Sequence, residues 1–189
     1  MEEQVLKNLT TLTGLSAQDF AILREYAPKI QPWGEKFAKA FYDTLFAYEL
    51  TAAVFKEGER ATREITLREW YLEVTSGELT EDFWQRQWTV GLIHISKKVT
   101  NPLMLGMMSR VQQLFLQECL QAFEPAQAEQ VYLAFKRVTD VIAGVITEGY
   151  FFSYVEAMSN VGGLKLSLVE RMIDLEINKK LAKLRKKPQ

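Results

Sequence analysis

Residues 88–98 have the sequence WTVGLIHISKK and form the last turns of a predicted helix that is mostly apolar. His94 in this stretch is the only histidine of the chain. A single imidazole excludes sites that need two or more, such as a three-histidine zinc centre or the helical HExxH pair. It leaves open a structural histidine, or a cofactor that needs one nitrogen ligand, of which haem iron is the leading example.

The composition predicts one globular unit and excludes several classes of protein. With 189 residues and 48% hydrophobic content the chain is long enough to bury a substantial core. Its net charge of -1 provides no basic field for nucleic acid. Cys119 is the only cysteine, which excludes an intrachain disulfide and favours a reducing cytoplasm. No stretch resembles a signal peptide or approaches the ~18 apolar residues of a membrane span, so we expect a soluble cytoplasmic protein.

Apolar residues recur at helical spacing in nearly every segment, which predicts an all-α chain. Prolines and capping residues mark where the helices begin and end. Asn101 is read as a cap that precedes a proline at the first helical position. The predicted helices run from the Ser16 cap to about residue 30, from Gly34, from about 60 to 74, from the Thr80 cap to His94, and over about 102–123 and 125–158.

Gly162 and Gly163 form the clearest break in the chain and divide it into a domain over residues 1–160 and a tail over 161–189. The tail combines an apolar stripe at helical spacing with a basic end, which predicts an amphipathic helix. The alternatives left open are packing on its own domain, pairing with a second subunit, and binding to a membrane surface or an acidic partner. The stripe and the basic end consist of Leu166, Val169, Ile173, Ile177, Leu181 and Leu184, and of Lys179, Lys180, Lys183, Arg185, Lys186 and Lys187.

Several short motifs, in this order and at this spacing, resemble the globin domain shared by globin-coupled sensors and protoglobins. They are the Phe41-Tyr42 pair followed by Leu45, then Trp70, then the run from Val90 to His94 with Lys97-Lys98 and Pro102 behind it. The resemblance covers about residues 8–158. It implies a globin fold with an additional N-terminal helix, here followed by a C-terminal helical tail.

The resemblance also implies a haem b site. His94 would be the proximal iron ligand, and Tyr42 would point at the distal face of the haem. One alignment places Thr66 on the distal side and another places Leu67 there, and both remain open. Leu103-Met104 stand where the family often has aromatic residues. The other residues expected to contact the cofactor are Phe41, Phe55, Trp70, Val90 and Lys98.

The function implied is reversible binding of a diatomic gas, oxygen, carbon monoxide or nitric oxide, at a pentacoordinate haem, in a gas or redox sensor. A hydrogen bond from Tyr42 would favour oxygen by roughly 1 to 3 kcal/mol. We expect a homodimer through the last two long helices and a signalling partner bound by the C-terminal tail. The chain would be either a standalone protein or a piece of a longer sensor. One alternative is a globin-like interaction module without haem. Another is nitric oxide dioxygenase or peroxidase activity, ranked lower because no reductase domain or flavin motif is present.

Overall fold

The computed structural model describes residues 3–185 and divides the chain into two compact units, Met1–Gly149 and Tyr150–Gln189. All regular elements of the described residues are helices, so the predicted all-α class is confirmed. None of these helices is long and apolar enough to cross a membrane. Lys186 and Lys187, part of the predicted basic end, lie outside the described residues.

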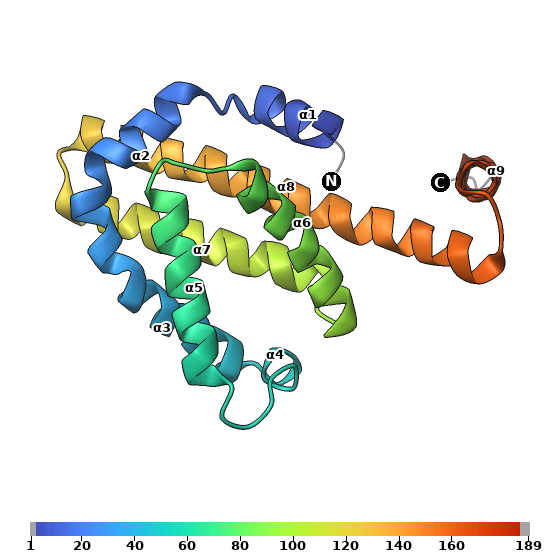
Figure 1. Cartoon of the computed structure of the whole chain (residues 1–189), viewed down its shortest axis with the longest axis horizontal. Coiled ribbons are helices and arrows are strands. Elements are labelled where there is room, and N and C mark those ends of the chain that lie inside the picture. The colour runs from blue at the N-terminus through green and yellow to red at the C-terminus, as the bar shows by residue number, and fades with distance from the viewer. Residues whose placement is uncertain (1–2, 186–189) are drawn as a thin grey trace. The chain divides into compact units, whose positions relative to one another are not determined.

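The first unit contains seven α-helices, a short 3-10 helix η1 and most of α8 (Figure 1). The last part of α8 and α9 (Leu166–Arg185) belong to the second unit. The bounds in the first unit are α1 (Glu3–Thr13), α2 (Ala17–Ile30), η1 (Gln31–Trp33), α3 (Gly34–Ala47), α4 (Glu49–Ala52), α5 (Arg60–Thr75), α6 (Glu81–Ser96), α7 (Asn101–Ala122) and the start of α8 (Pro125–Gly162).

Most of the predicted helices are confirmed, and two ends differ from the prediction. Thr100 is the residue before α7, so the prediction that Asn101 caps this helix is wrong by one position. α8 continues to Gly162, because a left-handed Gly163 with φ 61° is the residue that ends it. The amide of Leu164 donates to the Ser159 carbonyl at 3.0 Å, the bond that closes such a helix end. The boundary expected at residue 160 therefore falls inside α8.

Aromatic side chains join the helices of the first unit. The rings of Phe115 on α7 and Phe135 on α8 stack with centroids 3.8 Å apart. The ring centroid of Tyr71 on α5 lies 5.0 Å from that of Phe37 on α3. The Tyr71 hydroxyl donates a hydrogen bond to the Ile30 carbonyl at 2.8 Å. These buried contacts fix α3, α5, α7 and α8 around one core.

Gly77 lies in the turn between α5 and α6 and has a φ of 69°. A Cβ on this residue would lie 2.2 Å from the Phe20 carbonyl oxygen and 2.9 Å from the Arg24 amide nitrogen, both on α2. We expect Gly77→Ala to lower the free energy of unfolding by about 2–4 kcal/mol, since both the backbone angle and the contact are unfavourable. Denaturant titration of the two proteins measures this loss.

Gly58→Ala is the matched control for this substitution. Gly58 has a φ of 80°, but nothing lies within 4 Å of the position of its Cβ. Only the backbone cost applies there, which is about 1–2 kcal/mol. Equal losses for the two variants would show that the contact of Gly77 with α2 has no effect on stability.

Candidate functional site

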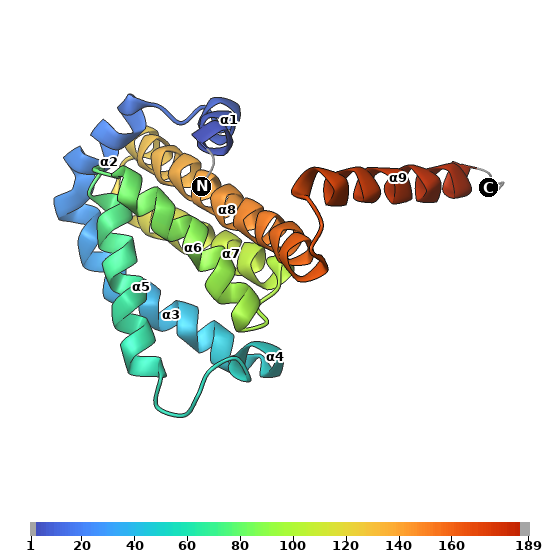
Figure 2. The same ribbon diagram turned by 45° about the vertical axis from the view of Figure 1, so that its right-hand side comes forward.

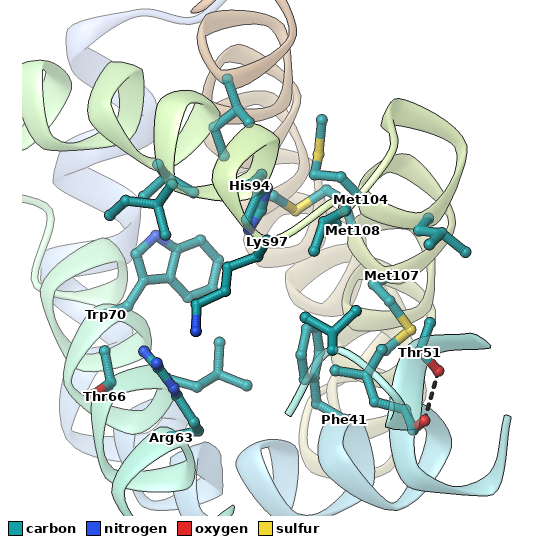
Figure 3. Close-up of a pocket in the computed structure, with 18 of the residues that line it drawn as sticks. Phe41, Thr51, Arg63, Thr66, Trp70, His94, Lys97, Met104, Met107 and Met108 are labelled. Carbon is teal, nitrogen blue, oxygen red and sulfur yellow. Dashed lines mark hydrogen bonds between the residues drawn. The ribbon is translucent and has the colours of Figure 1, made fainter. Parts of the chain in front are cut away.

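A cavity of about 350 Å³ lies inside the first unit. Its walls come from α3, α5, α6 and α7, from the segment around α4, and from Ile142 and Ile146 of α8. Figure 3 shows His94, Trp70 and Phe41 on different walls of this space. Eight of the nine residues predicted to contact a cofactor line it, namely Phe41, Tyr42, Phe55, Thr66, Leu67, Trp70, Val90 and His94.

His94 reaches the cavity because α6 presents one face to it. The Thr80 hydroxyl accepts a hydrogen bond from the Phe83 amide at 3.3 Å and caps this helix, as predicted. Val90, His94 and Lys97 follow at intervals of four and three residues, so they lie on the same face of the helix and all line the cavity. Burial lowers the pKa of the His94 imidazole. The ring is therefore neutral at neutral pH, the form that binds a metal.

Lys98 is the one predicted residue that does not line the cavity. α6 ends at Ser96, and the amides of Lys97 and Val99 both donate to the His94 carbonyl, at 3.1 and 2.9 Å. Lys98 takes a left-handed backbone with φ 58° in this turn and its side chain is exposed. Of these two adjacent lysines, Lys97, three positions after His94, is the one that lines the cavity.

Tyr42 lies among aromatic rings at the end of α3. Its side chain is 7% exposed, and its ring centroid lies 5.7 Å from that of Phe55 and 6.4 Å from that of Phe46. Burial raises the pKa of the Tyr42 phenol to about 12. The hydroxyl therefore stays protonated at neutral pH and is available as a hydrogen-bond donor.

Trp70 connects the two helices that face each other across part of the cavity. Its indole N–H on α5 donates to the Gln87 side-chain oxygen on α6 at 3.2 Å. The buried Gln87 amide nitrogen donates in turn to the Phe83 carbonyl at 3.3 Å. Because both side chains also line the cavity, this pair joins α5 to α6 at the cavity wall.

Thr66 and Leu67, the two alternatives for the distal side, both line the cavity. The Thr66 side chain is exposed, and its hydroxyl donates to the Thr62 carbonyl of its own helix at 3.1 Å. Leu67 is half-buried and apolar. A hydrogen bond from Thr66 into the cavity would require this intrahelical bond to break.

Two basic side chains that the sequence did not identify as site residues line the cavity. Arg63 on α5 and Lys97 at the end of α6 point toward each other in Figure 3. Glu59 also lines the cavity, and its carboxylate lies 3.6 Å from the Arg63 guanidinium. Arg63 precedes Leu67 by four residues and Trp70 by seven, so helical spacing was the signal that could have identified it.

α7 contributes thioethers to the wall. Leu103, Met104, Met107 and Met108 line the cavity, and Figure 3 shows Met104 and Met108 on the side near His94. Methionine side chains adapt their shape to a flat apolar surface and contact aromatic rings favourably. Leu103 and Met104 stand at the positions for which the family resemblance would lead one to expect aromatic residues.

Gly149 allows close contact between α6 and α8. A Cβ at residue 149 would lie 2.9 Å from the Trp88 carbonyl oxygen. The backbone of α6 therefore approaches that of α8 within two turns of His94. A larger residue at 149 would push α6 outward and change the cavity.

Comparison with known proteins identifies relatives of this architecture. The protoglobin family model matches residues 2–156. The globin domain of the Geobacter sulfurreducens globin-coupled sensor is similar in fold, with a TM-score of 0.70 and 19% identity, over 76% of this chain and 96% of that one. The ferric globin domain of E. coli DosC gives a TM-score of 0.63 and 16% identity, over 77% and 99% of the two chains. No match was found among curated proteins.

Proposed function

Because the chain belongs to the protoglobin family, we propose that it binds haem b through His94 and reversibly binds a diatomic gas as a sensor globin. The observation that supports this most directly is the position of the only histidine, which lies on the wall of a largely apolar cavity together with Tyr42. The cavity volume of about 350 Å³ falls in the range of cofactor sites.

The residues of the cavity match the chemistry of haem b. His94 offers one neutral imidazole nitrogen for iron. Aromatic, aliphatic and thioether side chains surround the space that the flat macrocycle would occupy. Arg63 and Lys97 supply positive charge for the two propionate groups of haem b. Bound haem would supply an iron whose sixth position accepts oxygen, carbon monoxide or nitric oxide.

The protein's own side chains would then set the affinity. His94 holds the cofactor from one side, and the bonds to its carbonyl fix the end of α6. Tyr42 donates a hydrogen bond to a gas that has partial negative charge, which favours oxygen over carbon monoxide. Phe55, Leu67 and Val90 give the cavity an apolar lining.

A spectrum of the purified protein tests the proposal. We expect a Soret band after expression or after reconstitution with haemin, and a shift of this band when carbon monoxide is added to the reduced protein. A protein that remains colourless with haemin would contradict the proposal and favour an interaction module without haem. Consumption of nitric oxide or peroxide at catalytic rates would assign an enzymatic function instead.

Arg63→Ala and Lys97→Ala are each expected to raise the rate of haem loss about 3- to 10-fold, since each removes one partner of a partly exposed propionate. Transfer of haem to excess apomyoglobin measures this rate. Lys98→Ala is the matched control, because Lys98 has the same charge and is adjacent but does not line the cavity. A larger effect of Lys98→Ala than of Lys97→Ala would show that the cofactor lies elsewhere.

We also propose a cytoplasmic homodimer that associates through α7 and α8 and signals through its tail. In support, four large side chains of α8 are more than half exposed and recur at intervals of three and four residues. They are Phe151, Tyr154, Met158 and Val161.

A further inference from the structure

The charges of α9 are unevenly distributed along its length. Its acidic residues, Glu170, Asp174 and Glu176, all precede residue 177. All its basic residues except Arg171 follow in the second half, namely Lys179, Lys180, Lys183 and Arg185. Figure 2 shows this helix from the side. An antiparallel second copy of α9 would therefore place basic residues opposite acidic ones.

α9 also has exposed apolar side chains. Ile177 is 49% exposed and Leu184 is 66% exposed, while Leu166 and Ile173 are half-buried. Together with Glu170 and Lys180 they occupy every position of a seam with alternating intervals of four and three residues, at 166, 170, 173, 177, 180 and 184. This spacing is that of the contact positions of a coiled coil.

We propose that α9 pairs antiparallel with α9 of a second copy of this chain. In one register each seam residue meets a complementary one. Leu166 faces Leu184, Glu170 faces Lys180, and Ile173 faces Ile177 of the second copy. Each contact occurs twice because the pair is two-fold symmetric about residue 175.

Charge determines the direction of the pairing. In a parallel pair Glu170 would face Glu170 and Lys180 would face Lys180, and both contacts are repulsive. In the antiparallel pair both become ion pairs. The salt bridges within the described residues include neither Glu170 nor Lys180, so both side chains are available. An anionic membrane would attract mainly the basic second half of α9, since Glu170, Asp174 and Glu176 would approach a surface of the same charge.

Spin-label distances in the full chain test the direction. Leu168→Cys, Leu175→Cys and Ala182→Cys are each labelled separately; all three sites are exposed and seven residues apart, while the native Cys119 is buried. The antiparallel pair predicts the shortest distance between copies at 175. At 168 and 182 the labels are offset by a further ~21 Å along the axis, which is twice seven residues at about 1.5 Å each. Equal distances at all three sites would indicate a parallel pair.

Charge variants test the register with the label at residue 175. Glu170→Lys and Lys180→Glu are each expected to reduce the short-distance population at least about tenfold, since each places like charges in both layers. The double variant restores the ion pairs with reversed sign and should regain the population. Arg171→Glu changes the charge as much as Lys180→Glu does, but lies outside the seam and should have little effect.

Besides a parallel pair, three results would overturn the proposal. The first is that no spin-label distance between two copies is detected at any of the three α9 sites, even if the chain dimerises through other helices. The second is a double variant no better than the single ones. The third is binding of the labelled helix to vesicles of phosphatidylserine and phosphatidylcholine in place of self-pairing, strengthened by Glu170→Lys. None of these measurements depends on haem, so they test the pairing of α9 independently of the proposed gas binding.

Discussion

His94→Gly is expected to abolish the Soret band of the reconstituted protein, and added imidazole is expected to restore it. The substitution removes the only imidazole of the chain and leaves a space of its shape in the cavity wall. Haem affinity should fall at least about a hundredfold, since even residues that only support a metal ligand account for up to that much. Titration with haemin, with and without imidazole, measures the change.

Thr89→Gly is the control for the loss of helix stability in this experiment. Thr89 is exposed on the same helix, so the substitution costs only about 0.3–0.5 kcal/mol in helix propensity. Its spectrum should match that of the wild type. An unchanged spectrum for His94→Gly would mean that another residue holds the iron, and the proposed site would be wrong.

Tyr42→Phe is expected to raise the rate of oxygen dissociation about 5- to 150-fold. The phenylalanine keeps the ring contacts with Phe46 and Phe55 and removes only the hydroxyl. The factor corresponds to the roughly 1–3 kcal/mol of a charge-assisted hydrogen bond. Carbon monoxide has little charge to stabilise, so its dissociation should change less than about threefold. Stopped-flow replacement of one gas by another measures both rates.

Thr66→Val distinguishes the two distal candidates. The Thr66 hydroxyl already donates to the Thr62 carbonyl, so its removal should change oxygen dissociation less than about threefold. The reverse result, a large effect at Thr66 and none at Tyr42, would assign the distal hydrogen bond to Thr66. Equal rates in both variants and the wild type would exclude a side-chain donor from either position.

Local signals were sufficient to predict most of the helices, and the family resemblance supplied eight residues that line the cavity. Thr80 caps α6 as its sequence indicates, and His94 follows Val90 by one turn on the same face. The sequence does not show where the helix ends, so it could not indicate that Lys97, and not Lys98, lines the cavity. In the structure α6 ends at Ser96, and Lys97 still continues the face that carries Val90 and His94. The left-handed backbone of Lys98, at φ 58°, turns the chain away from this face.

The remainder of the cavity depends on the distances between helices, which no local pattern specifies. Met107 and Ile146 occur at ordinary helical spacing and would be read as core residues. They line a cavity because α3, α5, α6, α7 and α8 enclose a space at this point, beside the Trp70–Gln87 hydrogen bond that joins α5 to α6. Arg63 resembles any exposed arginine of a charged helix until Lys97 is placed opposite it.

The close contact at Gly149 restricts how this sequence can diverge. Any side chain there would collide with the Trp88 carbonyl, a backbone atom that no neighbouring substitution can make smaller. Replacement of Gly149 would therefore need a shift of the whole of α6, and with it of His94. We therefore expect a replacement of Gly149 to alter the cavity, although residue 149 itself does not line it.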